Sequence, residues 1–343
     1  MTFGIAILGG GIFAKEEHLP AIKAGSDLKL VAIYSRSLKS AKSLEAGDDV
    51  DLYSDDSGAG KRLDDLLARS DVHGVVIALP ILVQPEIIRK ALKAGKHVLS
   101  EKPIAKDVKE AQELVDWYGK EIDSSKVTWG VAENGRFWPE FIYAADLAKS
   151  LGRLLQFQVR VHSFTGDDGK YFNTPWRKHP GYQGGFLLDG GVHYVAATRF
   201  LLGEKDNTVA TASAFTAQLQ EHLPPIDTLN ATLKTKAGVS GTFSVSFGTT
   251  FPRENTYQLA FEKGSIVVEG ASCKFRKPGS TAAEEKKFDR VSGVAAEIKE
   301  WAAGLKASKL DARQTADEAL KDLILLEAMF KSGEQNGAPV TVK

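Results

Sequence analysis

Cysteine is almost absent from this sequence, and neither sign of charge is in excess. One cysteine, Cys273, stands among 343 residues, so no internal disulfide can form. This cysteine has no Cys or His neighbour at the spacing of a metal site, so we expect no bound metal and a reducing, cytoplasmic compartment. The 44 Lys and Arg residues balance 44 Asp and Glu residues. That balance excludes the extended charged surface with which proteins bind nucleic acid or anionic membranes.

Long hydrophobic runs are also missing. No apolar stretch approaches the roughly 20 residues that a membrane-spanning helix needs. The N-terminal sequence MTFGIAILGGGIF has no basic region before its apolar residues, which is typical of a first strand rather than of a secretion signal. A content of 43% hydrophobic and 26% charged residues is typical of a globular chain. At roughly 150 residues per domain, the length predicts two domains.

Strand and helix patterns alternate over the first part of the chain. We predict strands at residues 3–8, 28–34, 72–79, 97–100 and 127–132, and helices at residues 15–24, 38–45, 62–69, 84–94 and 106–120. Pro20 interrupts the first of these helices, and we expect it to bend or divide the helix. The alternation predicts an α/β fold, a doubly wound parallel sheet with right-handed crossovers. We place this Rossmann domain at residues 1–133.

The pattern changes after residue 134 to short strands with tight turns. We predict helices at 139–149, 186–202, 294–305 and 315–331, and strands at 154–164, 209–218, 228–236, 239–247, 257–262 and 265–269. A loop rich in Gly, Asp and aromatic residues spans 165–185. The pattern predicts an α+β domain at 134–343 with an open, mainly antiparallel sheet. We expect helices to cover one face of this sheet and a second copy of the chain to cover the other, which makes a homo-oligomer.

A glycine motif follows the first predicted strand and opens the first helix. Residues 9–14 read GGGIFA and fit the pattern G-x-G-x-x-G/A. Gly9 permits the tight turn, Gly11 lets the backbone approach a pyrophosphate, and Ala14 is small enough for the helix to pack closely on the sheet. The free N–H groups of the helix N-terminus favour phosphates. The alternative is a glycine turn without a ligand, which spends conformational freedom for no gain.

The end of the second strand indicates which dinucleotide binds. NAD-binding proteins place an acidic residue there to hold the ribose hydroxyl. Here the segment carries Ser35 and Arg36 with no acid, and Lys39 follows one helical turn later. Ser35 can donate a hydrogen bond, and the planar cation of Arg36 suits a 2′-phosphate. The pattern favours NADP(H) over NAD(H); the alternative is a solvated arginine at a helix start.

Two further clusters carry groups able to move protons. Lys102 follows the predicted strand at 97–100, at the edge of a doubly wound sheet where ligands bind. Far along the chain, Asp189 and His193 are four residues apart and share one face of a predicted helix. Gly190 and Gly191 between them indicate a close approach of a ligand or of backbone. The alternative to a catalytic role is that Lys102 is an ordinary surface lysine, and that Asp189 and His193 form only a local hydrogen bond with each other.

Taken together, the glycine motif, Glu101-Lys102-Pro103 and the pair Asp189 and His193 resemble the glucose–fructose oxidoreductase / inositol dehydrogenase / rhizopine catabolism (Gfo/Idh/MocA) superfamily. Residues 11–14, 18–20, 130–134, 176–177 and 184–187 resemble a narrower fungal, cytosolic, NADP(H)-specific branch. The resemblance covers nearly the whole chain. It implies a Rossmann domain, a second sheet that often pairs subunits, a Lys/Asp/His catalytic centre and a cis peptide bond before Pro103.

Two positions depart from the pattern of the family. Many relatives have an acidic residue three positions after the motif histidine, where this chain has Ala196. Relatives also commonly place a histidine after the strand predicted here at 72–79, near Gln84. Both changes leave the identity of the substrate open.

These observations predict reversible hydride transfer between NADP(H) and a carbonyl or alcohol carbon of a small polar substrate, such as a sugar, polyol, aldehyde or ketone. Histidine titrates near neutral pH, so we expect His193 to be the acid or base, Asp189 to orient it or bind a substrate hydroxyl, and Lys102 to stabilise the developing alkoxide. The opposite assignment of Lys102 and His193 stays open. The residues expected to bind the cofactor are Gly9, Gly11, Ile12, Phe13, Ser35, Arg36, Lys39, Leu79, Pro80, Glu101, Lys102, Asn134, Trp176 and Arg177.

Three neighbouring residues have two interpretations. Arg136, Phe137 and Trp138 follow the last Rossmann strand and are candidates to line the substrate cleft, although core packing explains the two aromatic residues equally well. Two rival functions share the predicted fold. One is a regulator that senses the cofactor without turnover, and the other is a reductase of imines or dihydrodiols.

Overall fold

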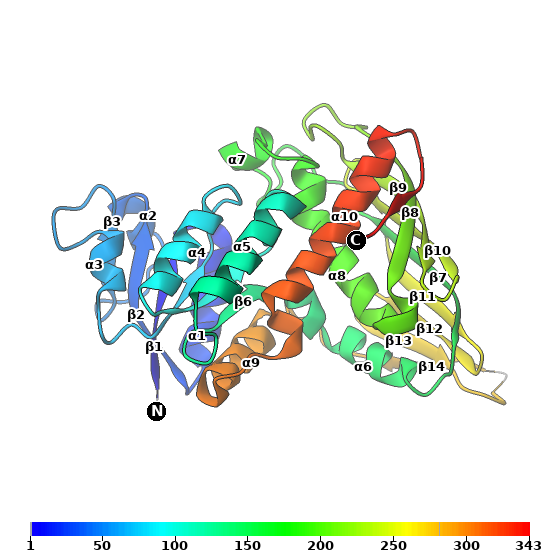
Figure 1. The fold of residues 1–343 in the computed structure, drawn as a ribbon, viewed down its shortest axis with the longest axis horizontal. Helices are drawn as coiled ribbons and strands as arrows, with labels where there is room; N and C mark the ends of the chain where they lie inside the picture. Colours follow the sequence, from blue (N-terminus) through cyan, green and yellow to red (C-terminus); the bar gives the residue numbers. More distant parts are fainter. Residues whose placement is uncertain (1, 281) are drawn as a thin grey trace. The chain divides into compact units, whose positions relative to one another are not determined.

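The computed structural model describes residues 2–280 and 282–343, which form two compact units. The first unit contains Met1–Asn134 and Val294–Leu320, and the second contains Gly135–Gly293 and Lys321–Lys343. Each unit is built around one sheet, and Figure 1 labels the strands of both. No helix among the described residues is long and apolar enough to cross a membrane.

The sheet of the first unit is wholly parallel. Its six strands lie in the order β3-β2-β1-β4-β5-β6, which is the classic order of a dinucleotide-binding fold. The strands are β1 (Phe3–Leu8), β2 (Leu28–Ser35), β3 (Asp51–Ser54), β4 (Gly74–Ile77), β5 (His97–Glu101) and β6 (Trp129–Ala132). All four residues of β4 and five of the six residues of β1 are buried. Successive side chains point to opposite faces, so both faces of these central strands are covered.

Helices connect the six strands of this unit as the alternation predicts, and two further helices come from its second segment, residues 294–320. They are η1 (Ala14–His18), α1 (Leu19–Ala24), α2 (Leu38–Lys42), α3 (Leu63–Leu67), α4 (Gln84–Lys93), α5 (Val108–Glu121), α9 (Val294–Ala307) and η4 (Ala312–Gln314). Helical residues run without a break from 12 to 24, so Pro20 does not divide the first helix. A π-helical turn, η1, precedes α1, and Pro20 lies in the first turn of α1, where its missing N–H costs nothing.

Strand β3 is absent from the sequence-based prediction. It has four residues, lies at the edge of the sheet and begins with the exposed Asp51. So short an edge strand has too few buried positions to give an apolar pattern. Its pairing with β2 still matters, because the loop after β3 lies beside the loop after β2.

The second sheet has nine strands in the order β14-β13-β12-β11-β7-β10-β9-β8-β15. They are β7 (Leu154–His162), β8 (Val209–Ala217), β9 (Thr228–Thr235), β10 (Ser240–Ser246), β11 (Glu254–Phe261), β12 (Gly264–Glu269), β13 (Ser272–Arg276), β14 (Glu284–Lys287) and β15 (Val340–Thr341). All neighbours pair antiparallel except β7 and β10, which are parallel. The expected open and mainly antiparallel sheet is confirmed, and β13, β14 and β15 are additional to the prediction.

Burial alternates along the strands of this sheet. In β9 the side chains of Leu229, Ala231 and Leu233 are buried, whereas Asn230 and Thr232 are exposed. One face of the sheet is therefore apolar and covered, and the other is polar and open. The helices of the unit are η2 (Asn134–Phe137), α6 (Pro139–Ala148), α7 (Pro175–Lys178), α8 (Gly185–Leu202), η3 (Lys205–Asn207) and α10 (Ala316–Glu334); η2 and α10 each begin in the first unit.

The segment after residue 293 differs from the expected domain organisation. The prediction runs the second domain without a break from 134 to 343, whereas residues 294–320 belong to the first compact unit. Ile298, Trp301 and Leu305 of α9 lie in one buried cluster with Ile5 and Ile22. The helical pattern of α9 is visible in the sequence, but the surface on which it packs is not.

A buried cluster of charges holds the second unit together. Arg136 donates hydrogen bonds of 2.7 and 2.6 Å to the two carboxylate oxygens of Asp322. Arg199 donates a further bond of 2.5 Å to Asp322 Oδ1. Arg136 is 2% exposed and Asp322 1% exposed. The observed contacts of Arg136 are thus structural, in contrast to the expected contact with substrate, and Phe137 is buried as core packing requires.

Replacing Asp322 by asparagine is expected to destabilise the protein strongly. Asp322→Asn removes the carboxylate that binds the buried Arg136 and the partly buried Arg199, and breaking a buried ion pair typically costs about 3–5 kcal/mol of unfolding free energy. Urea titration measures this loss. Asp317→Asn, at an exposed position of the same helix, is the control and is expected to cost less than about 1 kcal/mol. Equal stability of the two variants would contradict the assignment.

Candidate functional site

The loop after β1 passes close to two neighbouring segments. Gly9 has φ +130°, and a methyl group on it would overlap the carbonyl oxygen of Ala78, the residue after β4. A methyl group on Gly10 would overlap Ser40 of α2. Both positions therefore require glycine, because the backbone passes between β4 and α2 without room for a side chain.

Gly11 differs from the two glycines before it. No atom lies within 4 Å of the place where its Cβ would stand, and the residue is exposed. Ile12 beside it is also exposed, at 38%. The protein itself thus does not require glycine here, and the open space leaves the backbone N–H groups accessible. A pyrophosphate approaching this backbone explains the missing side chain, so the loop fits a bound dinucleotide.

Two cations stand free at the end of β2. Arg36 and Lys39 are exposed, and neither side chain forms a hydrogen bond or ion pair with any residue in 2–280 or 282–343. Ser35 has a different environment. It is 5% exposed and donates a 3.0 Å hydrogen bond to Ser40 Oγ. The hydroxyl of Ser40 in turn donates a 3.4 Å hydrogen bond to the backbone oxygen of Gly10. The hydroxyl of Ser35 links the second strand to the glycine loop.

Two acids missed by the sequence analysis lie near this segment. Tyr34 donates a 2.7 Å hydrogen bond to Asp55, and the N–H of Leu38 donates a 2.8 Å bond to Asp56. A hydrogen bond from Ser54, together with the Leu38 N–H, lowers the pKa of Asp56. No signal in the sequence points to these acids, because they follow β3, the strand that the prediction lacks.

The segment after β4 contains Leu79 and Pro80, both partly buried. It follows Ala78, whose carbonyl group lies against Gly9, so the two predicted cofactor residues are adjacent to the glycine loop. Gln84 opens α4 a few residues later. Its side chain is 1% exposed, and neither atom of its amide has a hydrogen-bond partner among the described residues.

The end of β5 is tied to the first helix. Nε2 of His18 lies 2.7 Å from Oε1 of Glu101, and His18 is fully buried. The ring of Phe13 meets the His18 ring edge-on, with 5.3 Å between centroids. The peptide bond between Lys102 and Pro103 is cis, as the family resemblance implies. Phe13 and Glu101, two of the predicted cofactor residues, thus meet through His18.

In the second unit, α8 carries Asp189 and His193 on one face. Gly184 and Gly185 have φ of +69° and +51° and start this helix. Gly190 does not face backbone, because the ring of Phe247 occupies the space beside it. The close approach expected at Gly190 is therefore made by an aromatic side chain.

The carboxylate of Asp189 is paired with an arginine. Nε of Arg177 donates a 2.6 Å hydrogen bond to Asp189 Oδ2, and Arg177 also donates a 2.9 Å bond to the backbone oxygen of Tyr171. The guanidinium carbon lies 4.0 Å from the centroid of the Trp176 ring. Asp189 is 4% exposed. Arg177 and Trp176 therefore assemble around Asp189, and the predicted aspartate is a charged group with a fixed orientation.

The predicted residues thus form two groups, each within one unit. Gly9, Gly11, Ile12, Phe13, Ser35, Arg36, Lys39, Leu79, Pro80, Glu101, Lys102 and Asn134 belong to the first unit, and Trp176, Arg177, Asp189 and His193 to the second. Asn134 is partly buried at the start of η2. Within residues 2–280 and 282–343, no three His, Cys, Asp or Glu side chains are grouped as a metal site requires.

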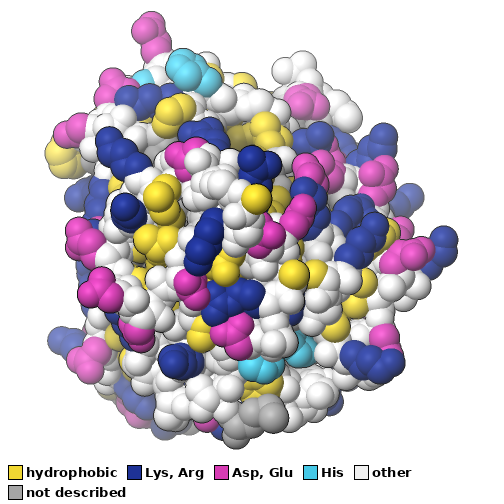
Figure 2. All heavy atoms as spheres, turned by 90° about the vertical axis from the view of Figure 1, so that its left-hand side faces the viewer, with side chains coloured by type: hydrophobic (Ala, Val, Ile, Leu, Met, Phe, Trp, Pro, Cys, Tyr) yellow, Lys and Arg dark blue, Asp and Glu magenta, His cyan; other side chains and the backbone are white. Residues whose placement is uncertain are grey.

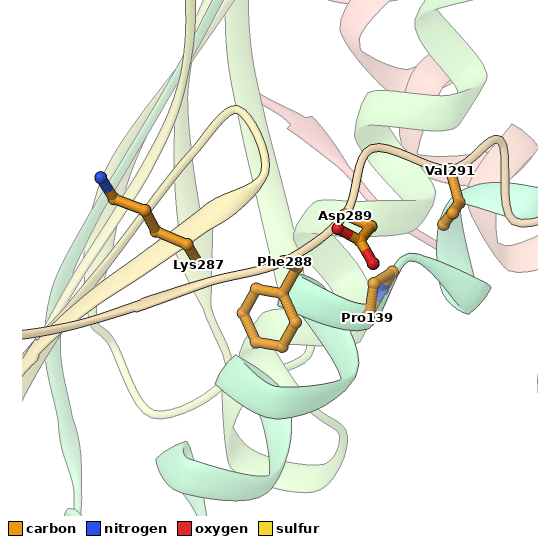
Figure 3. A pocket seen from close by; sticks show the side chains of 5 residues that line it. All are labelled: Pro139, Lys287, Phe288, Asp289 and Val291. Carbon is orange, nitrogen blue, oxygen red and sulfur yellow. The ribbon is translucent and has the colours of Figure 1, made fainter.

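A hollow of about 510 Å³ lies elsewhere in the second unit, lined by Pro139, Lys287, Phe288, Asp289 and Val291. Figure 3 shows the ammonium group of Lys287 directed away from the other four side chains. None of the predicted residues lines this hollow. On the face drawn in Figure 2, positive and negative side chains are interspersed, without an extended area of one sign.

Comparison with known proteins agrees with this geometry. Residues 3–122 match the oxidoreductase family with an NAD-binding Rossmann fold, and residues 147–267 match the GFO/IDH/MocA C-terminal domain. The chain is 42% identical to the dehydrogenase FPY6 of Fusarium mangiferae, with 99% of each chain covered. It is 32% identical to an uncharacterized protein, YMR315W, of Saccharomyces cerevisiae over 99% of this chain and 98% of the other.

A solved structure supports the same relationship. The crystal structure of an oxidoreductase from Thermotoga maritima has a TM-score of 0.86 and 29% identity, and covers 100% of this chain and 99% of its own. The chain is also 26% identical to a D-xylose 1-dehydrogenase (NADP(+)) of Haloferax volcanii, over 98% of this chain and 99% of the other. It is 26% identical to an inositol 2-dehydrogenase of Rhizobium meliloti, over 78% of this chain and 76% of the other. The matches over both units show that the chain belongs to the Gfo/Idh/MocA family of oxidoreductases.

Proposed function

We propose that the protein is an NADP(H)-dependent oxidoreductase that transfers a hydride to or from a carbonyl or alcohol carbon of a small polyhydroxylated substrate. The observation that carries the cofactor assignment is the free Arg36, an exposed guanidinium without an acidic partner, with Lys39 beside it. Such a pair suits the 2′-phosphate that distinguishes NADP(H) from NAD(H). One relative is named for NADP(+).

The substrate class rests on two supports. Relatives are named for D-xylose and for inositol, both of which carry several hydroxyl groups. The second support is the group around Asp189, where a carboxylate fixed by Arg177 can accept a hydrogen bond from a substrate hydroxyl. A sugar or polyol therefore fits better than a simple apolar aldehyde.

The chain's own residues divide the chemistry between them. The dinucleotide, when bound, supplies or accepts the hydride. His193 gives a proton to the substrate oxygen during reduction and takes it back during oxidation. Lys102 places positive charge beside that oxygen while it carries negative charge. Asp189, held in one orientation by Arg177, positions a substrate hydroxyl.

We also propose that the protein acts as a homo-oligomer in the cytoplasm. The open face of the second sheet carries exposed Thr232 and Thr242 on paired strands, and Phe215 on the same face is 64% exposed. A second copy of the chain would remove this aromatic ring from water. The chain has a single cysteine, Cys273, which is buried and free, and so low a cysteine content suits a reducing compartment.

Removal of Arg36 tests the choice of cofactor. In Arg36→Ala a charged hydrogen bond is lost, at about 1.5–3 kcal/mol, so NADPH is expected to bind at least ten times more weakly while NADH is little affected. Fluorescence titration of both cofactors measures the two dissociation constants. Lys109→Ala, which removes another exposed cation of the same unit, is the control. Equal weakening of NADPH and NADH would reject the 2′-phosphate contact.

The catalytic assignment is tested with Lys102→Ala and His193→Ala. Each is expected to lower kcat about 100- to 10,000-fold on the best substrate found in a panel of sugars, polyols, aldehydes and ketones. Both variants are expected still to bind the cofactor. His179→Ala, at an exposed histidine, is the control. Full turnover in both variants with cofactor bound contradicts the assignment.

The proposed oligomer is tested by its mass in solution. Light scattering at micromolar concentration is expected to give at least twice the chain mass of 37.1 kDa. Thr232→Arg combined with Thr242→Arg places charges on the open face and is expected to shift the mass toward the monomer. Lys299→Arg, a conservative change elsewhere, is the control. A wild-type protein that is monomeric at all concentrations overturns the proposal.

A further inference from the structure

Tyr182 carries a buried hydroxyl group that nothing in its surroundings satisfies. The residue is 8% exposed, and its hydroxyl has no hydrogen-bond partner among the described residues. Buried polar groups are nearly always hydrogen-bonded, because an unpaired one costs about 1–3 kcal/mol. A hydrogen-bond partner from outside the chain would remove this cost.

The charges around Tyr182 define what that hydroxyl can do. Burial is the main cause of the raised pKa of Tyr182, and the nearby carboxylate of Asp189 raises it further, whereas the guanidinium of Arg177 acts in the opposite direction. The hydroxyl therefore stays protonated and remains a hydrogen-bond donor. Asp189 is already bound by Arg177 at 2.6 Å. Tyr182 thus lies within the electrostatic reach of the ion pair without being part of it.

A second unpaired hydroxyl lies on the same segment of chain. Oγ1 of Thr174 is buried without a partner among the described residues. Thr174 precedes α7, where a threonine side chain normally caps the first N–H groups, yet here it makes no such bond. The ring of Trp176 lies between these residues in sequence and 6.3 Å from the ring of Tyr182. Two hydroxyls on the segment from Thr174 to Tyr182 therefore have no partner among the described residues.

We propose that Tyr182 is a substrate-binding residue, whose hydroxyl donates a hydrogen bond to a hydroxyl group of a sugar- or polyol-like substrate, with Thr174 contacting a second hydroxyl. This inference rests on the proposed function and deepens it, because it names which residues of the second unit select a polyhydroxylated substrate. A site with unpaired polar groups rejects analogues that lack the matching hydroxyl. Arg177 and Asp189 supply the charge, and Tyr182 and Thr174 supply the neutral contacts.

Tyr182→Phe removes only the hydroxyl and tests the proposal. With D-xylose, D-glucose and myo-inositol as probes, kcat/KM on the best of them is expected to fall 10- to 100-fold, mainly through KM, with the dissociation constant of NADPH unchanged. The preference for D-glucose over 2-deoxy-D-glucose, where the wild type shows one, is expected to shrink in the variant. Thr174→Val is expected to give a smaller loss. Tyr143→Phe, at a partly buried tyrosine of the same unit, is the control and is expected to change neither value.

Thermal unfolding without ligand gives a readout that is independent of turnover. Phenylalanine removes an unpaired buried hydroxyl, so the unfolding midpoint of Tyr182→Phe is expected to stay level or rise. A lower midpoint with unchanged kcat/KM would show an internal structural bond and overturn the proposal.

Calorimetric titration of the three probes in the presence of NADP⁺ tests the substrate-binding role of Tyr182 separately from the proposed reaction. Probe binding that the wild type shows without turnover, and that Tyr182→Phe weakens, rejects the proposed reaction but supports the binding role. Wild-type protein that neither binds nor converts any probe overturns the binding role, as does a Tyr182→Phe variant that binds and turns over every probe as the wild type does.

Discussion

The backbone of Gly9 and Gly10 passes between the end of β4 and the start of α2 with no room for a side chain. This narrow passage brings the residues that follow β1, β2 and β4 next to one another. It leaves Gly11 facing open space and joins Ser35, through Ser40, to the same loop. Arg36 and Lys39 have no ion-pair partner among the described residues, and they follow β2 at this same edge of the sheet. A phosphate group is the ligand that their positive charge would bind there.

Carboxylates and hydroxyl groups at the candidate site differ in whether they have partners inside the chain. Carboxylates at the candidate site are held by partners inside the chain, Asp189 by Arg177 and Glu101 by His18. The hydroxyls of Tyr182 and Thr174 have no hydrogen-bond partner among the described residues. Leaving a buried charge unpaired costs far more than leaving a hydroxyl unpaired, which explains why Asp189 and Glu101 have partners inside the chain.

Sequence reasoning succeeds where the information is local. The alternation of strands and helices and the glycine motif follow from neighbouring residues, and the cis bond before Pro103 is implied by the family resemblance. It fails where pairing is distant or the element is short. Strand β3 has four residues, and the acids after it are missed with it. The parallel pairing of β7 with β10 and the packing of Trp301 with Ile5 and Ile22 have no local signal. The absence of a hydrogen-bond partner for Tyr182 among the described residues appears only when its neighbours are known.

The position of α9 has a consequence for the way the chain is made. Ribosomes release the N-terminal end first, so domains usually fold in the order of their synthesis. Here Trp301 follows Asn134 by 167 residues, and the cluster around Ile5 and Ile22 is incomplete until that tryptophan arrives. At roughly 5–20 residues per second, the nascent unit waits on the order of ten seconds or more with part of its apolar core exposed. Such an interval is long enough for chaperones to bind the emerging polypeptide.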